Sequence, residues 1–270
     1  MKKTILITGS TDGIGKLTAI KLARDGHEVY LHGRSADKIQ DSIEAVKQAS
    51  DNDQIKGVVA DLSDFSAVVR VAAEIGSAVE KLDILINNAG VYHSPRPVNA
   101  NGLDMRMVVN YLSPVLLTNL LMPLLKKAIQ PRVINLSSAA QQRILPGLLD
   151  GEVSVPVNSS YAQSKLALTM WSSYLANKES DVAVIAVNPG SLLDTKMVKE
   201  AFGQSWSSAD KGADILYELS VADTPSNRSG NYFDNDSGQF TRAHSDAYDP
   251  VKIKQLIGKT EQILSAVSSQ

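Results

Sequence analysis

The segment TILITGSTDGIG, residues 4–15, sets the topology of the chain. Its first five residues, Thr4–Thr8, form a short apolar run rich in β-branched side chains, which predicts a buried strand. Three glycines follow at positions 9, 13 and 15, and apolar residues at helical spacing continue from Ile14 to Arg24. A strand, a glycine turn and a helix in this order predict a βα unit, whose helix N-terminus can hold the phosphates of a dinucleotide.

Glycine serves this turn in three ways. It permits a tight turn, close approach of the backbone to a pyrophosphate, and close packing of the helix against the strand. The three residues between Gly9 and Gly13 make the spacing different from the common GxGxxG pattern, and an ordinary tight turn is the alternative. The residues expected to bind the cofactor here are Gly9, Ser10, Thr11, Asp12, Gly13, Ile14 and Gly15.

The alternation of strand and helix continues along the whole chain. Candidate strands are Thr4–Thr8, Glu28–His32, Lys56–Ala60, Leu82–Asn87, Arg132–Leu136, Val182–Val187 and Gly230–Phe233. Helical patterns cover Ile14–Arg24, Ala36–Ala49, Phe65–Val79, Leu103–Ala128 and Tyr161–Asn177. The pattern predicts an α/β fold with one Rossmann-type doubly wound parallel sheet of about seven strands flanked by helices, in a single domain over residues 1–270. Two long segments near 139–160 and 188–207 follow strand ends, where ligands bind, and are expected to hold the substrate.

Composition narrows the classes of function. The net charge of −2 gives no general attraction to nucleic acid, so we expect no nucleic-acid partner. There are no cysteines, which suits a reducing compartment, and we expect a cytoplasmic protein. The four histidines lack the spacing of metal ligands, so no metal site is expected. The apolar stretch Met107–Leu125 contains several polar residues and prolines, which favours a buried helix over a membrane span.

The ends of the second and third candidate strands bear on the choice of cofactor. An acidic residue at the end of the second strand would hold the ribose 2′-hydroxyl of NAD and repel a 2′-phosphate. This chain has glycine followed by Arg34 and Ser35, which favours NADP(H), although Arg34 could simply be a solvated residue. Asp61 and Leu62 lie where the adenine edge should fall, and Asp61 could equally cap a helix. After the fourth strand, Asn87 precedes three residues that let a cofactor lie close, namely Asn88, Ala89 and Gly90, although this could be an ordinary polar turn.

Candidate chemistry follows the fifth strand. Tyr161 and Lys165 are four residues apart in a predicted helix, so their side chains share one face. The Lys165 ammonium, together with an oxidised nicotinamide, is expected to lower the pKa of the Tyr161 phenol and make it an acid/base. Ser138 can donate a hydrogen bond to a substrate oxygen, or merely cap the strand end. Asn110 lies within an apolar helix, where a water-linked contact to Lys165 or simple bonding to backbone would satisfy its amide.

In combination these motifs resemble the short-chain dehydrogenase/reductase family over essentially the whole chain, and the segments 103–111 and 139–160 are similar to its retinol-dehydrogenase-like branch. The resemblance implies that Tyr161 is the general acid/base and that Lys165 binds the nicotinamide ribose. It implies that Ser138, rather than Ser137, steadies the substrate oxygen, and that Asn110 anchors a proton-relay water. It also implies a set of residues against the nicotinamide amide, namely Pro189, Gly190 and Thr195. Family members commonly pair through the helix near 112–125, so a homodimer or homotetramer is expected.

The sequence therefore predicts an NADP(H)-dependent oxidoreductase that moves a hydride between nicotinamide and a small carbonyl or alcohol substrate. Apolar side chains in the two long segments suggest a hydrophobic substrate, although such side chains often form a loop's own core. One alternative is a non-catalytic NADP-binding sensor, against which the presence of both Tyr161 and Lys165 counts. The other is a nucleotide-sugar epimerase or dehydratase, but the stretch after the sixth strand leaves little room for a sugar-nucleotide domain.

Overall fold

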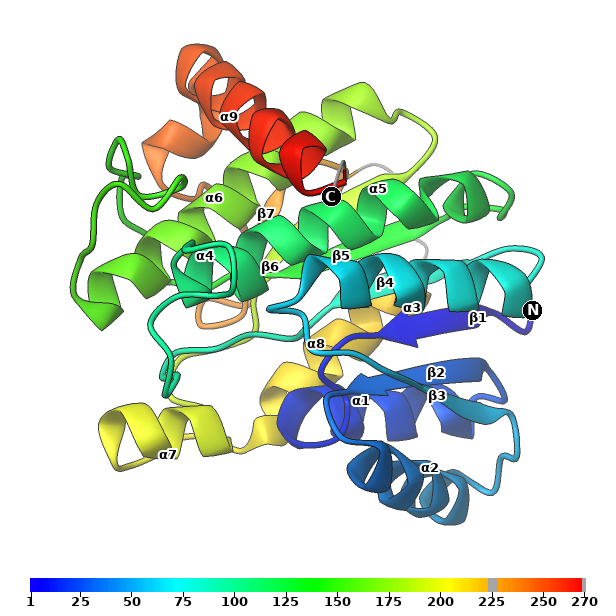
Figure 1. The fold of residues 1–270 in the computed structure, drawn as a ribbon. Helices are drawn as coiled ribbons and strands as arrows, with labels where there is room; N and C mark the ends of the chain where they lie inside the picture. Colours follow the sequence, from blue (N-terminus) through cyan, green and yellow to red (C-terminus); the bar gives the residue numbers. More distant parts are fainter. Residues whose placement is uncertain (223–227, 269–270) are drawn as a thin grey trace.

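The computed structural model describes residues 1–222 and 228–268, and its centre is a single eight-stranded sheet. The strand order is β3-β2-β1-β4-β5-β6-β7-β8, in which β1 to β7 run parallel and β8 is antiparallel (Figure 1). The strands are β1 (Thr4–Ile7), β2 (Glu28–Gly33), β3 (Ile55–Val59), β4 (Ile84–Asn87), β5 (Arg132–Leu136), β6 (Ala183–Asn188), β7 (Tyr232–Asp234) and β8 (Gln239–Thr241). The predicted doubly wound α/β fold is confirmed.

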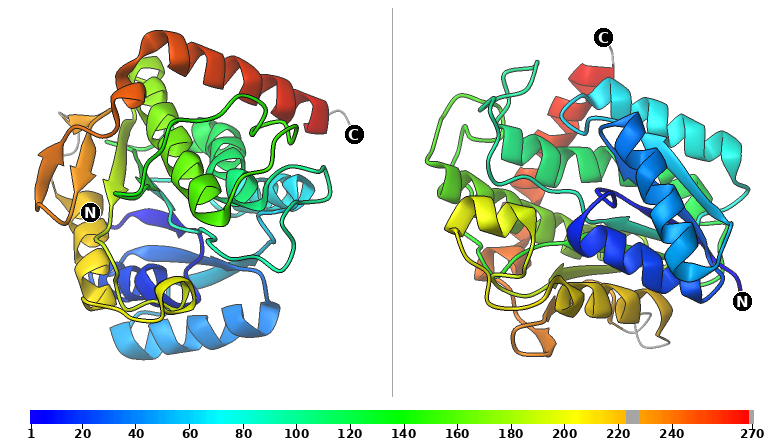
Figure 2. Two further views of the ribbon diagram at one scale, coloured as in Figure 1. Left: turned by 90° about the vertical axis from the view of Figure 1, so that its left-hand side faces the viewer. Right: turned by 90° about the horizontal axis from the view of Figure 1, so that it is seen from below.

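Helices cover both faces of the sheet. On one face lie α1 (Gly13–Arg24), α2 (Ala36–Ser50) and α8 (Ala209–Val221), and on the other α3 (Phe65–Ala78), α5 (Ser113–Leu125) and α6 (Val157–Lys178) (Figures 1 and 2). Alternation along β1 shows why: Ile5 and Ile7 enter the core under α1, whereas Leu6 enters the core under α3 and α5. Side chains of successive strand residues point to opposite faces, so a strand that is apolar throughout contributes to two cores.

The end of the sheet differs from the sequence prediction. The seventh strand begins at Tyr232, because Gly230 has a φ of +81° and cannot continue an extended strand. An eighth strand, β8, was not predicted, since it is only three residues long and joins β7 through a tight turn. Short strands of this kind carry too few residues for a pattern to be visible.

The long apolar helix predicted over Leu103–Ala128 is present as one continuous run, Met105–Leu125, with a π-helical turn inside it. A short helix α4 (Met105–Met107) leads into a π-helical turn, η1 (Val108–Leu112), which continues as α5. The segment Met105–Leu125 is long and apolar enough to cross a membrane, but 83% of its most apolar stretch is buried inside the protein. It is therefore the core helix that its polar residues and prolines indicated.

Further helices in the described residues include α7 (Lys196–Phe202), a 3₁₀ turn η3 (Ser245–Tyr248) and α9 (Pro250–Ser268). Helix α9 lies over the outer side of α5 and α6 (Figures 1 and 2), where Leu256, Ile257 and Leu264 are buried. A hydrogen bond of 2.7 Å joins the hydroxyls of Tyr111 and Thr260 across this contact. The surface expected to join subunits is thus largely covered by the chain itself.

The two predicted substrate segments also contain helix. Helix α6 begins at Val157, so Tyr161 lies in its second turn and not at its first residue. Pro156 occupies the N-cap position, and its fixed φ suits the entry to a helix. In the second segment, Thr195 caps α7 by accepting a hydrogen bond from the Val198 amide.

Candidate active site

The predicted site residues converge at the carboxyl ends of the parallel strands. In Figure 1, β1 points to the left, and the loops after β4 and β5 lie on that side together with helix α7. The carboxyl ends of neighbouring parallel strands meet at one edge, so side chains far apart in sequence become neighbours there. The glycine turn, Tyr161 and Lys165 all lie at this edge.

The glycine turn packs directly on the segment after β4. Gly9 has a φ of +63° and Gly13 a φ of +53°, the left-handed region that favours glycine. A Cβ on Gly9 would lie 2.8 Å from the Ala89 Cα, and one on Gly15 would lie 2.5 Å from the Asn88 Nδ2. No larger residue fits at Gly9 or Gly15 without moving backbone or a bonded amide.

Thr8 and Asn88 fasten this contact. The Asn88 side-chain amide donates to the carbonyls of Thr8 and Gly9, both at 2.8 Å. In return the Thr8 hydroxyl accepts from the amides of Asn88 and Ala89, both at 3.0 Å. The asparagine after β4 thus ties two strand ends together.

His32 is a residue of the turn that the sequence did not reveal. Its Nδ1 accepts a 3.1 Å hydrogen bond from the Gly9 amide, and its own amide donates to the Ser10 hydroxyl at 2.9 Å. The ring is buried, and this burial lowers the pKa of His32 to about 4, so the imidazole is neutral and able to accept. Only its place at the end of β2 could have pointed to this role.

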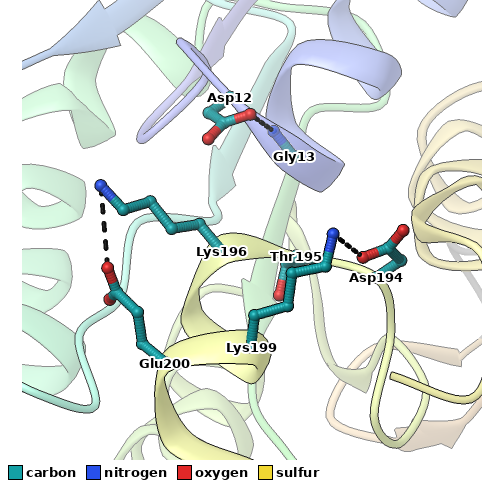
Figure 3. Close-up of a pocket in the computed structure, with 7 residues that line it drawn as sticks. All are labelled: Asp12, Gly13, Asp194, Thr195, Lys196, Lys199 and Glu200. Carbon is teal, nitrogen blue, oxygen red and sulfur yellow. Dashed lines mark hydrogen bonds and ion pairs between the residues drawn. The ribbon is translucent and has the colours of Figure 1, made fainter. Parts of the chain in front are cut away.

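A cavity of about 450 Å³ opens beside the glycine turn (Figure 3). Asp12, which caps α1 by accepting from the Gly13 amide at 2.7 Å, faces Thr195 and α7 across it. The seven lining residues are Asp12, Gly13, Asp194, Thr195, Lys196, Lys199 and Glu200. The two lysines hold intrachain partners, Glu200 at 3.7 Å from Lys196 and Asp194 at 2.6 Å from Lys199. The N-terminus of α1 thus opens on a cavity whose lining carries two lysines and three carboxylates.

The residues predicted to bind the adenine and its ribose differ in exposure and in hydrogen bonding. Arg34 is exposed, and Ser35 caps α2 by accepting from the Lys38 amide at 3.4 Å. Asp61 accepts from the Ser63 amide at 2.9 Å and closes a local turn, whereas the N-cap of α3 is Asp64, so the helix-cap alternative for Asp61 is wrong. Leu62 is buried in the core at 4% exposure, so its side chain does not face a ligand. Sequence position alone could not tell which of these side chains turns inward.

The loop after β6 completes the cofactor edge. Gly190 has a φ of +123°, and the Pro189 carbonyl accepts a 2.8 Å hydrogen bond from Asn235. Asn188 donates to Asp234 and Asp236, at 2.8 and 2.9 Å, which ties the loop to the end of β7. This loop leads directly to Thr195 at the cavity.

Ser138, Tyr161 and Lys165 are brought together beneath the loop after β4. The Ser138 hydroxyl hydrogen-bonds the Tyr161 phenol, and the Lys165 Nζ lies 5.6 Å from the centre of the Tyr161 ring. Ser137 is instead buried and committed to Thr169 at 2.6 Å. The occupied hydroxyl of Ser137 leaves Ser138 as the serine that can reach a ligand.

Gly90 brings the segment after β4 against the lysine. A Cβ on Gly90 would lie 3.6 Å from the Lys165 Nζ and 3.4 Å from the Asn110 Oδ1. Lys165 is buried at 4% exposure and donates a 2.6 Å hydrogen bond to the Leu136 carbonyl. Burial lowers the pKa of Lys165 to about 8, because the charged form loses its water.

The pKa of Tyr161 is raised in the protein alone. Burial raises the pKa of the phenol, the hydrogen bond from Ser138 lowers it, and the nearby Tyr92 raises it further. Desolvation of the phenolate thus sets the direction of the shift in the protein alone, and Lys165 is not among its causes. The predicted lowering by Lys165 together with an oxidised nicotinamide stays a prediction. Tyr92 was not predicted, yet its ring centre lies 5.1 Å from that of Tyr161.

The Asn110 side chain is hydrogen-bonded to the segment after β4 and to helix α6. Its Oδ1 accepts from the Val91 amide at 2.8 Å, while its Nδ2 donates to the Val91 carbonyl and the Ser164 hydroxyl, both at 3.0 Å. These bonds correspond to the backbone alternative, while the Oδ1 atom keeps a second lone pair. The proton-relay water at Asn110 stays a prediction. Asn110 lies in the π-helical turn η1, a feature that often accompanies functional sites.

The far side of Ser138 is held by the C-terminal part of the chain. Its carbonyl accepts hydrogen bonds from the Gln141 amide and the Tyr232 hydroxyl, both at 3.0 Å. Gln141 in turn accepts from the His244 amide at 3.1 Å. Neither Gln141 nor Tyr232 belongs to a motif, so the sequence offered no signal for them.

Comparison with known proteins agrees with this geometry. A model of the short chain dehydrogenase family matches residues 3–206. Retinol dehydrogenase 13 of Mus musculus is 32% identical over 254 residues, 86% of this chain and 75% of that protein. Retinol dehydrogenase 12 of Bos taurus is 36% identical over 204 residues, 74% of this chain and 64% of that protein.

Solved structures are similar as well. An uncharacterised protein from Mycobacterium paratuberculosis superimposes with a TM-score of 0.78 at 27% identity, covering 96% of this chain and 92% of that one. A short chain dehydrogenase from Escherichia coli, solved in complex with NADPH, superimposes with a TM-score of 0.71 at 25% identity. That comparison covers 86% of this chain and 96% of the other.

Proposed function

Since the chain belongs to the short-chain dehydrogenase family and has retinol-dehydrogenase-like relatives, we propose that it is an NADP(H)-dependent oxidoreductase of hydrophobic carbonyls and alcohols. Tyr161 acts as the general acid/base. The observation that carries the proposal is the contact of Tyr161 with Ser138 and Lys165, which the segment after β4 joins to the glycine turn, since Ala89 packs on Gly9 and Gly90 packs near Lys165. A reacting oxygen placed between Ser138 and Tyr161 would meet two hydroxyl donors.

The residues present fit a nicotinamide dinucleotide. Gly9 lets the turn pack closely on Ala89, and the α1 N-terminus at Gly13 faces a cavity of suitable size. Thr195 and the lysines of α7 close the other side of that cavity. When bound, the cofactor supplies or accepts the hydride at its nicotinamide ring.

The chain's own groups handle the proton. In carbonyl reduction, Ser138 donates a hydrogen bond to the carbonyl oxygen, whose negative charge grows as hydride reaches the carbon. The Tyr161 phenol gives its proton to that oxygen, yielding the alcohol and leaving a phenolate. The Lys165 ammonium, 5.6 Å from the ring centre, stabilises this phenolate until solvent returns the proton. Alcohol oxidation runs through the same steps in reverse.

Preference for NADP(H) rests on the end of β2. No carboxylate follows the strand there, and Arg34 is exposed at the N-terminus of α2, where its guanidinium could bind a 2′-phosphate. The Escherichia coli relative solved with NADPH is consistent with this choice. Asp61 can still accept the adenine amine at its second oxygen, since the Ser63 amide takes only one.

A hydrophobic substrate is supported by the two loops over the site. Leu148 and Leu149 are buried in the core on the side of α3, α5 and α6, and Leu193 is buried as well. Leu145, Val153 and Trp206 remain exposed, at 41%, 39% and 72%. The relatives named for retinol act on an apolar alcohol, which agrees with such a rim.

Assembly and location remain predictions. A homodimer or homotetramer was expected through the helix near 112–125, but α9 covers that side and leaves mainly Asn119, Leu120 and Pro123 exposed on α5. A contact through α5 would therefore be small. Light scattering during gel filtration measures the assembly, and fractionation of cells tests the proposed cytoplasmic location.

The test of the function is oxidation of NADPH and of NADH by purified protein over a panel of hydrophobic aldehydes and ketones. We expect turnover that favours NADPH. Tyr161→Phe should lower kcat by about 10²- to 10⁴-fold while cofactor affinity is retained. Tyr174→Phe, on the same helix away from the site, is the control. Cofactor binding without turnover of any carbonyl would contradict the proposal.

A further inference from the structure

A buried ion pair lies one helix away from the site and has no part in the chemistry described above. Asp104 and Arg106 flank the start of α4, and their side chains are only 13% and 5% exposed. The Asp104 Oδ2 lies 2.5 Å from an Arg106 terminal nitrogen, and the Asp104 Oδ1 caps α4 by accepting from the Arg106 and Met107 amides. A buried charge pair is costly unless further polar groups complete its hydrogen bonds.

The group that completes this pair is Ser160, the residue directly before Tyr161. Its hydroxyl donates to the Asp104 Oδ1 at 2.6 Å and accepts from the Arg106 Nε at 3.0 Å. Ser160 is fully buried. The Ser160 hydroxyl therefore acts once as a donor and once as an acceptor. Its two partners lie 54 and 56 residues earlier in the chain.

This contact fastens the first turn of α6, together with a 2.9 Å hydrogen bond from the Ser159 hydroxyl to the Gln142 side chain. The N-cap residue of α6, Pro156, gives no side-chain hydrogen bond to the turn. Helix starts without a capping side chain fray, because their first amides lack partners within the helix. The hydrogen bonds of Asp104 and Arg106 to Ser160 hold this first turn in place, and Tyr161 is the next residue.

A second fastening lies one turn further on. Asn110 donates to the Ser164 hydroxyl at 3.0 Å, and Ser164 is four residues after Ser160 on the same face of α6. Tyr161 and Lys165 occupy the adjacent face, each one residue later. Two fixed points on one face prevent α6 from rotating about its axis, so they set the direction of the neighbouring face.

We propose that Asp104 and Arg106 are positioning residues, which hold Ser160 so that α6 presents Tyr161 to Ser138 and to the substrate oxygen. The inference rests on the proposed function, because it assigns the pair to the geometry of the same reaction. A misplacement of about 1 Å can cost a reaction about 100-fold, so a modest rotation of α6 is enough to matter. The rival reading is that the pair serves only the stability of the fold.

Ser160→Ala is the informative variant. It removes the link to α6 but leaves the Asp104–Arg106 contact intact, whereas loss of either charge would strand the other and endanger folding. Ser172→Ala is the matched control on the same helix. Ser172 is also buried, accepts from Asn135 at 2.8 Å and donates to the Leu168 carbonyl at 2.7 Å.

Two measurements decide between the readings. Steady-state kinetics with NADPH should show kcat about tenfold lower in Ser160→Ala, with KM and the Kd of NADPH within about twofold of wild type. NMR of protein labelled with ¹³Cζ-tyrosine reports the phenol itself, and Tyr161→Phe assigns its resonance among the eight tyrosines. We expect that resonance to shift in Ser160→Ala and to stay in place in Ser172→Ala.

An unshifted Tyr161 resonance together with control-like kcat would overturn the proposal, even if Ser160→Ala lowered Tm. Equal shifts in both serine variants would also overturn it, since the effect would then belong to any lost buried hydrogen bond. If wild-type protein reduces no carbonyl, the proposed function fails. In that case only the ¹³Cζ resonance of Tyr161 tests the positioning role.

Discussion

The ammonium of Lys165 lies 5.6 Å from the centre of the Tyr161 ring, yet Lys165 is buried and its charge is bonded to a main-chain carbonyl. Burial lowers the pKa of Lys165 from its ordinary 10.5 to about 8. Lys165 is needed for the proposed chemistry, yet its charged form lowers the free energy of unfolding.

Replacing Lys165 should make the protein more stable and less active. Below pH 8 both folded and unfolded chains carry the Lys165 proton, and folding must desolvate the charge. Lys165→Met should raise the free energy of unfolding at pH 7 by up to about 3 kcal/mol. From pH 8 to 10.5 only the unfolded wild type stays protonated at Lys165, so wild type gains stability with rising pH and the difference should vanish. Urea unfolding at pH 7, about 9 and about 10.5 measures this.

Lys178→Met, at the exposed end of the same helix, is the control for that experiment, and its stability should differ from wild type by about 0.5 kcal/mol or less. A Lys165→Met protein less stable than wild type at pH 7 would show that the bond to Leu136 outweighs desolvation. Activity should fall in either case.

Gly9→Ala should destabilise the protein by about 2–5 kcal/mol and abolish cofactor binding. The new Cβ meets the Ala89 Cα at 2.8 Å, in addition to the strain of a φ of +63°. Gly26→Ala separates the two effects, because Gly26 has a φ of +77° and nothing lies within 4 Å of the position that a Cβ would take there. Gly26→Ala should cost only about 1–2 kcal/mol. Equal losses in thermal or urea unfolding would mean that the contact with Ala89 is unimportant.

Arg34→Ala should reduce discrimination between the two cofactors. One charge-assisted contact to a phosphate contributes about 1.5–3 kcal/mol, so kcat/KM for NADPH should fall about 10- to 100-fold. The value for NADH should change by about twofold or less, since NAD lacks the 2′-phosphate. Arg70→Ala, on the surface of α3, controls for loss of charge. A parallel loss with both cofactors would refute specific 2′-phosphate binding.

Acid should destabilise the protein through His32. Burial lowers its pKa in the folded state to about 4, from 6.5, so between these values the unfolded chain binds a proton that the folded chain refuses. Stability is therefore full above pH 6.5 and falls by up to about 3 kcal/mol as the pH approaches 4. His32→Asn, which can still accept from Gly9, should lose less over this range than wild type. His93→Asn, at an exposed position, should keep the wild-type slope; if all three slopes agree, His32 is not the cause.

Much of the framework could be predicted because its signals are local. A β-branched run before Gly9 and a helical pattern after it need no knowledge of distant residues, and the same holds for Tyr161 and Lys165 four residues apart. Residues that tie strand ends, such as Asn88, follow from their place at the sheet's carboxyl edge. These parts of the structure are set within one βα unit at a time.

What could not be predicted depends on contacts between distant segments. The acceptor for the Gly9 amide is His32, and the partners of Ser160 are Asp104 and Arg106; segment 103–111 shows a family likeness, but nothing in it indicates a contact with Ser160. The rise in the pKa of Tyr161 in the protein alone could not be predicted, because it depends on burial. Burial is the sum of many contacts, and the four-residue spacing of Tyr161 and Lys165 does not indicate it.

Helix α9 has a consequence for biosynthesis. It is translated after every strand of the sheet, so a nascent chain can assemble the sheet while the outer side of α5 and α6 is still bare. During that interval the apolar residues that Leu256, Ile257 and Leu264 later cover face solvent or a chaperone. Premature termination in this region would leave them permanently exposed and favour aggregation, so the yield of folded protein depends on finishing translation through α9.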